Sequence, residues 1–391
     1  MDPFLAELIR LVVALVVAVA VIIGSAVVLS YGDRKVLALS QDRLGPYHYG
    51  PHGILTPIAD TLKLLLKEDV SPIRGDPVLH ILAPIVFVMA CVGAYAVLPI
   101  LGPDWSGADL NIGLVYIVAV ASFGAIGVLL AGWSSNNKYS TLGGLRVVGQ
   151  MISYEVPLVL SLVPPAMMAG TLSLNGIVSK QDDLVWYGAI LPLAFLIMFI
   201  CGLAETNRNP FDLPEAENEI VAGYLTEYSG IRWAMFFMAE YGNMVVSCSL
   251  AAVLFLGGWK GPFIENVPFL APFYMLGKTY VLIALFLWVR ATLPRLRVDQ
   301  LMGFAWKVLI PLALVNIGIT GVLVVLVPGA FSIPVIGTVH VYQIPLAVID
   351  WVLAIGLVVG VPRWQQRNRL LPAKASFRKQ TVGHLADAVG R

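Results

Sequence analysis

The chain of 391 residues is too apolar for a soluble protein, because 58% of its residues are hydrophobic and only 13% are charged, against about 25% charged in soluble domains. A formal net charge of +1 gives no reason to expect nucleic-acid binding. Several uncharged runs are long enough to cross about 30 Å of hydrocarbon, among them Leu11–Gly32, Pro77–Pro103, Leu184–Ala204 and Met244–Trp259. Composition therefore predicts an all-α polytopic membrane protein.

Nine membrane spans are predicted, at residues 9–30, 78–101, 112–133, 146–169, 185–204, 233–257, 273–292, 306–328 and 345–362. We expect the first run to remain as a helix, because Met1-Asp2-Pro3 lacks the basic segment of a signal peptide. With the N-terminus outside, most of the 25 Lys and Arg residues fall in inner segments, which the positive-inside rule favours. We therefore predict one transmembrane domain over 1–362 and a basic cytoplasmic tail over 363–391.

The first inner loop is too long to be a simple turn, and residues 53–68 within it form an amphipathic pattern. Apolar residues from Ile54 to Leu66 share one face, while Asp60, Lys63 and Lys67 share another. Such a helix lies in the plane of the membrane interface. It is either a surface helix whose lysines extend to water or one wall of an entrance from the lipid.

An acidic loop at 205–232 follows the fifth span. Between Ala204 and Glu227 it holds six carboxylates and one base, Arg208. Crowded acids near a membrane repel one another and resist desolvation, so we expect some to titrate as a coupled set with raised pKa values. Asp212 and Glu215 have the spacing of a helix capping box, which explains only two of the six. The loop is therefore interpreted as a proton-handling segment.

Three acidic residues lie inside predicted spans, where ionisable groups are functional candidates by default. Glu155 lies in the fourth span, and Glu240 shares a helical face with Asn243 and Ser247 in the sixth. Both are interpreted as proton-relay residues, with a structural hydrogen bond as the alternative. Asp350, near the outer end of the ninth span, is interpreted as a residue close to water.

Metal and haem sites are not predicted. Cys91, Cys201 and Cys248 stand alone in apolar runs, without a pair or a zinc spacing. The five histidines do not pair on spanning helices.

Eight motifs, in order along residues 5–330, resemble those of one family. They begin at Tyr31 (YGDRKV), Arg43 (RLGP), Pro57 (PIADTLK), Gly132 (GWSSNNKY), Ile152 (ISYEV), Glu205 (ETNRNPFDL), Ala239 (AEY) and Trp288 (WVRATLPRLRVDQLM). The chain thus resembles the H-type membrane subunits of bacterial respiratory complex I, the proton-translocating NADH:quinone oxidoreductase. This family is homologous to mitochondrial NADH dehydrogenase subunit 1.

The resemblance implies an enzyme subunit that forms the quinone access chamber and links quinone reduction to proton translocation through a chain of carboxylates. It implies ubiquinone or menaquinone as substrate, and no metal, haem or flavin bound to this chain. It also implies residence in the bacterial cytoplasmic (inner) membrane. The implied partners, besides lipid, are hydrophilic quinone-site and iron–sulfur subunits, small membrane subunits and antiporter-like proton-pumping subunits.

The resemblance also assigns roles to individual positions. Family positions at the chamber or its entrance correspond to Arg34, Arg43, Asp60 and Lys63. Those of the proton path correspond to Glu155, Glu205, Arg208, Asp212, Glu215, Glu217, Glu219, Glu227 and Glu240. The family positions in the inner loop that faces the redox arm, the hydrophilic part of the complex, correspond to Arg290, Arg295 and Arg297.

The chain departs from the family pattern at several points. Asp33 stands where the family usually has Glu, Tyr47 replaces a usual Asn, and Thr56 replaces a usual Gln. The ninth span extends beyond the usual eight-helix core.

Two other functions are considered for this chain: the anchor subunit of a related membrane-bound hydrogenase, and an ion channel or transporter. The complete ETNR and RLGP motifs favour the quinone-reducing family over the first, and the lack of an internal repeat disfavours a transporter.

Overall fold

The computed structural model describes residues 3–100, 102, 108–181, 186–212, 220–262, 264, 267–327, 330–333 and 337–360. The predicted tail at 363–391 and the predicted proton-path residues Glu215, Glu217 and Glu219 lie outside these ranges. Within them, eight helices are long and apolar enough to cross a membrane, and a further apolar helix, Pro192–Glu205, is shorter. The predicted all-α polytopic class is confirmed.

The elements follow one another in the expected order. The N-terminal half contains α1 (Pro3–Ser40), α2 (Thr56–Leu66), α3 (Pro77–Tyr95), α4 (Gly113–Ser134), α5 (Lys138–Ala169), α6 (Leu174–Lys180) and α7 (Tyr187–Ile190). It is followed by α8 (Pro192–Glu205), α10 (Gly230–Phe255), α11 (Ala271–Thr292), α12 (Val298–Phe304), a π-helix (Ala305–Leu309) and α13 (Ile310–Leu326). Short 3-10 turns occupy Pro51–Gly53, Gly223–Leu225 and Pro268–Leu270. The antiparallel strands β1 (Ala330–Ile333) and β2 (Gly337–His340) lead to the last helix, Gln343–Gly360.

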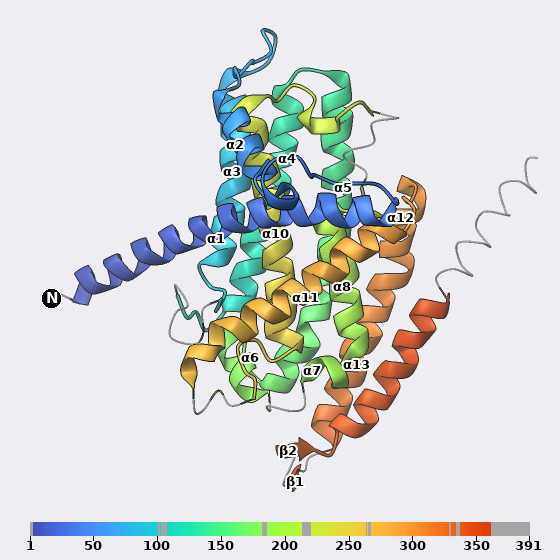
Figure 1. The fold of residues 1–391 in the computed structure, drawn as a ribbon. Helices are drawn as coiled ribbons and strands as arrows, with labels where there is room; N and C mark the ends of the chain where they lie inside the picture. Colours follow the sequence, from blue (N-terminus) through green and yellow to red (C-terminus); the bar gives the residue numbers. More distant parts are fainter. Residues whose placement is uncertain are drawn as a thin grey trace, which may run out of the picture.

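The bundle is built around α10, of which 83% of the most apolar stretch is buried. Helix α1 crosses the bundle, and its N-terminal part extends past the other helices (Figure 1). Its 38 residues span about 57 Å, well beyond the hydrocarbon thickness. Figure 1 shows α2 and α12 towards one end of the bundle and the β-hairpin at the opposite end.

Several helix ends are completed by side chains, because terminal N–H and C=O groups lack partners within the helix. Asp76 accepts hydrogen bonds from the backbone of Val78 and Leu79 at the start of α3. Asn137 accepts one from Tyr139 at the start of α5. At the C-terminal end of α10, the Lys278 ammonium donates to three carbonyls of the turn that follows, those of Leu256 (2.6 Å), Gly258 (3.0 Å) and Lys260 (2.6 Å).

Glycines allow neighbouring segments to approach closely, as is common between membrane helices. A Cβ on Gly132 of α4 would lie 3.2 Å from the Cα of Gly144 on α5. A Cβ on Gly143 would lie only 2.6 Å from the Cα of Gly223. These contacts join α4 to α5, and α5 to the turn that precedes α10.

Two predicted spans differ from the observed helices. The fifth, expected as one helix over 185–204, is broken at Leu191 (φ −119°, ψ 55°) between α7 and α8. Pro192 begins α8, and a proline disfavours helical geometry at the residue before it. The eighth, expected over 306–328, begins earlier with α12 and passes through the π-helix. Pro311 cannot donate to the carbonyl four residues before it, which explains the irregular turn there.

Candidate functional site

A cavity of about 330 Å³ lies between α1, α2 and α10. Its walls are mainly apolar and include Ile23 and Val27 of α1, Leu64 of α2 and Met238 of α10. Trp233 and Phe237 on α10 also line it, with stacked rings whose centroids lie 4.9 Å apart. The cavity can therefore hold an elongated apolar molecule, which is typical of lipid-soluble ligands.

One end of this cavity is polar. Arg34 of α1 and Asp60 of α2 form an ion pair across it, with Nη1 and Oδ2 2.5 Å apart. Their side chains are 45% and 37% exposed, which places the pair at the rim. An exposed pair of this kind contributes little to stability, so its charges remain available to a polar headgroup.

Behind the rim lies a buried charge cluster centred on Asp33, the residue next to Arg34. Its carboxylate accepts a hydrogen bond from the Tyr241 hydroxyl (3.1 Å) and forms an ion pair with Arg290. Arg208 approaches the same carboxylate at 3.9 Å, and its guanidinium lies over the Tyr241 ring, 4.4 Å from the centroid. The cluster joins α1, α10 and α11 to the turn that follows α8.

Four of the described carboxylates that the sequence predicts on a proton path fall into two groups. Glu205 lines a small internal cavity of about 40 Å³ together with Asn243 and Ser247 of α10, a volume sufficient for water. The charge of Glu155, which hydrogen-bonds to Ser122 of α4, interacts with that of Glu205. These residues form the first group.

The second group consists of Glu227 at the end of the acidic loop and Glu240 in α10, the helix that follows. Glu240 is buried and accepts a hydrogen bond from the Tyr224 hydroxyl at 2.9 Å. Glu227 accepts one from the Asn137 side chain at 2.7 Å. Beside it, burial raises the pKa of Tyr228 to about 12, so this hydroxyl stays protonated.

The start of the acidic loop is fixed by a single buried amide. The Gln150 side chain donates to the carbonyls of Ala204 (2.7 Å) and Phe211 (2.8 Å) and to the side chain of Asn207 (3.3 Å). This arrangement holds the residues that flank Arg208, and therefore positions Arg208 against Asp33. Gln150 was not a predicted site residue, although a polar side chain in the middle of a span is the signal that could have identified it.

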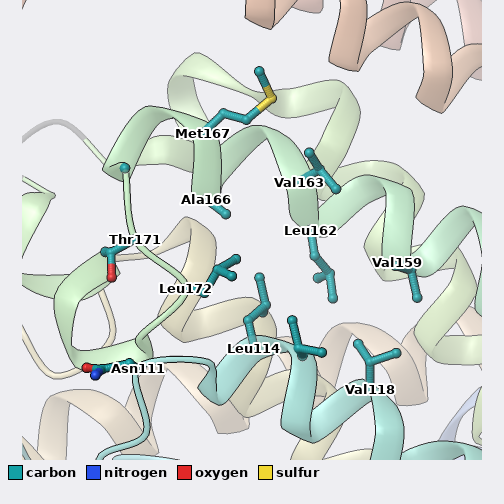
Figure 2. Close-up of a pocket in the computed structure, with 12 residues that line it drawn as sticks. Asn111, Leu114, Val118, Val159, Leu162, Val163, Ala166, Met167, Thr171 and Leu172 are labelled. Atoms are coloured by element: carbon teal, nitrogen blue, oxygen red, sulfur yellow. The ribbon is translucent and has the colours of Figure 1, made fainter.

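Another hollow, of about 580 Å³, lies between α4 and α5. Figure 2 shows aliphatic side chains of both helices around it, with Asn111 and Thr171 at one side. None of its described lining residues is ionisable, so it offers no group for proton or electron chemistry.

Comparison with known proteins identifies the family. A family model described as NADH dehydrogenase matches residues 12–321. The chain belongs to the NADH dehydrogenase family. It is 46% identical over 314 residues to the second H-type subunit of the NADH-quinone oxidoreductase of Geobacter metallireducens, covering 75% of this chain and 90% of that protein. Identity to the first H-type subunit of Geobacter sulfurreducens is 48% over 314 residues (75% and 89%), and identity to the H-type subunit of Dehalococcoides mccartyi is 43% over 329 residues (84% and 91%).

The predicted family is therefore confirmed, and the structure shows where its predicted site residues lie. Arg34 and Asp60 meet in the cavity, whereas Arg43 and Lys63 are exposed outside its lining. Arg290 turns inwards to Asp33, while Arg295 and Arg297 are exposed after α11. Asp212 is partly buried at the last described position before the acidic part of the loop.

One interpretation from the sequence was wrong. Asp350 does not lie close to water: it is fully buried, and its carboxylate accepts a hydrogen bond from Asn316 of α13 at 3.4 Å. The reason is that the last helix packs against α13 and the broken α7–α8 segment, where the Trp351 ring nitrogen donates to the carbonyl of Ala189 at 3.0 Å. The central role of Asp33 was also missed, because its partners are distant in sequence.

Proposed function

We propose that this chain is the H-type membrane subunit of an NADH-quinone oxidoreductase and that the cavity between α1, α2 and α10 admits the quinone. The observation that carries the proposal is the pairing of long apolar walls with the single polar rim formed by Arg34 and Asp60. A quinone has the same division, with an apolar tail and a polar headgroup. Family membership and the names of the relatives support it.

A tryptophan at Ala234 tests this entrance. Ala234 lines the cavity, so Ala234→Trp should narrow it without changing any charge. In the assembled complex, we expect quinone-linked NADH oxidation to fall several-fold with a long-tailed quinone and much less with a short-tailed one. Electron transfer from NADH to ferricyanide should be unchanged, because it does not need the membrane subunit.

Ala59→Trp is the matched control, because Ala59 of α2 is exposed and does not line the cavity. It should leave both quinone activities near those of the wild type. If Ala234→Trp affects the two quinones equally, or neither of them, in a complex shown to be fully assembled, the cavity is not the entrance.

We further infer that the buried charges link quinone reduction to proton transfer. Reduction of a quinone to a quinol consumes two electrons and two protons, so charge builds up at the headgroup until protons arrive. The Asp33 cluster lies next to the rim residue Arg34, and Arg208 joins it to the turn after Glu205. The proposed proton path comprises Glu155, Glu205, Arg208, Asp212, Glu215, Glu217, Glu219, Glu227 and Glu240.

Glu205→Gln tests this link, because it keeps the shape of the side chain and removes its proton exchange. Quinone-linked NADH oxidation and proton pumping should both fall, with ferricyanide reduction unchanged. Asp109→Asn serves as a control, since Asp109 is an exposed acid that accepts a hydrogen bond from Ser173, away from these residues. Wild-type pumping in an assembled Glu205→Gln complex would disprove the role of Glu205.

The proposed partners are the hydrophilic quinone-site and iron–sulfur subunits, the small membrane subunits and the antiporter-like subunits, with the exposed Arg295 and Arg297 facing the redox arm. The proposed location is the bacterial inner membrane, with the N-terminus outside and the C-terminus in the cytoplasm. A reporter that is active only outside the cytoplasm, fused after Arg391, should stay silent. A strong signal would show that the C-terminus lies outside the cytoplasm and would contradict this orientation.

A further inference from the structure

A polar cleft of about 490 Å³ lies at one end of the bundle, away from the quinone cavity. It is formed by the turn before α3 and the turn between α4 and α5. Its polar lining consists of Arg74, Ser135, Asn136, Asn137, Lys138 and Glu227. Four of these belong to the GWSSNNKY motif, which enters the proposed chemistry through the hydrogen bond from Asn137 to Glu227.

The two turns are held in a fixed relative position. The backbone N–H of Asp76 donates to the carbonyl of Ser134 at 3.0 Å, and the Asn136 side chain donates to the carbonyl of Arg74 at 3.0 Å. A Cβ on Gly75 would lie 2.7 Å from the same Ser134 oxygen, so the contact between the turns requires glycine. The cleft is therefore pre-organised rather than formed by loosely placed side chains.

The charges of the cleft favour an anion. Arg74 and Lys138 are both exposed, and within the described part of the chain neither forms an ion pair. Among the described lining residues Glu227 is the one acid; its carboxylate accepts the Asn137 hydrogen bond, and the two cations exceed it in charge. Helix α5 begins beside the cleft, and the partial positive charge of its N-terminus adds to the two cations, whereas the N-terminus of α3 is already capped by the Asp76 carboxylate.

The surroundings indicate a lipid rather than a free ion. Trp133 is 69% exposed and Tyr139 is 42% exposed, and aromatic residues of this kind mark the membrane interface. Val78 of α3 and Leu142 of α5 are exposed next to them, close to the start of the helices that begin at the cleft. An anion bound here would thus have apolar surface directly beside it for acyl chains.

We propose that Arg74 and Lys138 bind the phosphate of an anionic phospholipid headgroup, with its acyl chains lying along the start of α3 and α5. Basic pockets beside membrane helices are known sites for such headgroups. This site would anchor the turn between α4 and α5, and it is independent of whether the chain handles quinone.

Native mass spectrometry of the full chain in detergent tests the proposal. Phosphatidylglycerol and phosphatidylcholine are added separately at equal concentrations, and inorganic phosphate is added at the same concentration to the protein that has bound phosphatidylglycerol. We expect phosphatidylglycerol to bind, and the double variant Arg74→Gln with Lys138→Gln to weaken its binding about thirtyfold, as follows from the loss of two interfacial cations. Lys67→Gln with Lys307→Gln removes two exposed cations outside the cleft and should change the affinity little.

The apparent melting temperature of both double variants should match that of the wild type, which excludes misfolding as the cause. Equal binding of phosphatidylcholine, or displacement of the lipid by inorganic phosphate at equal concentration, would overturn the proposal. It would also be overturned if the cleft variant kept its lipid but lost a protein partner during purification of the complex, because the cleft would then be a protein-docking site.

Discussion

Replacing Gly143 with alanine should destabilise the protein, although alanine is the better helix former. Gly143 lies in the second turn of α5, where the substitution gains up to about 1 kcal/mol in helix propensity. However, its Cβ would lie 2.6 Å from the Cα of Gly223 and 2.9 Å from the backbone nitrogen of Tyr224. These are backbone atoms that cannot rotate away, and overpacking of this kind costs about 1–3 kcal/mol or more. Because the clash at 2.6 Å is with backbone, we expect the upper part of this cost and a net loss of about 2 kcal/mol.

The same substitution at Gly149 provides the control. Gly149 lies on the same helix, and the nearest atom to its added Cβ would be the Cε of Met302 at 4.0 Å. Here the helix propensity is gained without a clash, so Gly149→Ala should be neutral or stabilising. Membrane proteins commonly unfold irreversibly, so the two variants must be compared by apparent melting temperature at one scan rate in one detergent.

The predicted result is a Gly143→Ala melting temperature that lies a few degrees below that of Gly149→Ala. Because the clash moves the turn that carries Tyr224, its hydrogen bond to Glu240 should also weaken. Quinone-linked activity should therefore fall only in Gly143→Ala. Equal melting temperatures would refute the close approach of α5 to Gly223.

Three further substitutions test buried polar contacts. Asp33→Asn removes the carboxylate shared by the buried Arg208 and the partly buried Arg290 and should cost about 3–5 kcal/mol, seen as a lower melting temperature; an unchanged melting temperature would contradict it. Asn316→Ala removes one hydrogen-bond donor from the buried Asp350 carboxylate and should cost about 1–3 kcal/mol, most of which Asp350→Leu in the same chain should restore. Lys278→Met removes the ammonium that donates to the carbonyls of Leu256, Gly258 and Lys260, so it should speed amide hydrogen exchange in residues 256–260. Unchanged exchange would show that the lysine does not hold this turn in place.

The helices were predictable because each predicted span is a long apolar run with few charged residues. The interruptions at Leu191 and at the π-helix were not predicted, although Pro192 and Pro311 are their local causes. A proline can begin, kink or end a helix, so its effect depends on the packing of neighbouring helices. The amphipathic segment expected over 53–68 is likewise a helix, but a shorter one, over Thr56–Leu66.

The candidate site was predictable only in part, because most of its contacts join residues far apart in sequence. Arg34 and Asp60 share one inner loop and its flanking helix, and they do meet. By contrast, 208 positions separate Asp33 from Tyr241, and 257 separate it from Arg290. No periodicity in one sequence reveals such pairs. Asp350 was misplaced for the same reason, since its burial depends on Asn316 and on the broken α7–α8 segment.

The lysine that completes the end of α10 also bears on the order in which this protein is made. The carbonyl of Leu256 receives its hydrogen bond from a side chain 22 positions later. When the end of α10 leaves the ribosome, that lysine still lies inside the exit tunnel, and the terminal carbonyls can be satisfied only by water. Helix α10 therefore reaches its final position only together with α11, and the two are expected to enter the membrane as one hairpin.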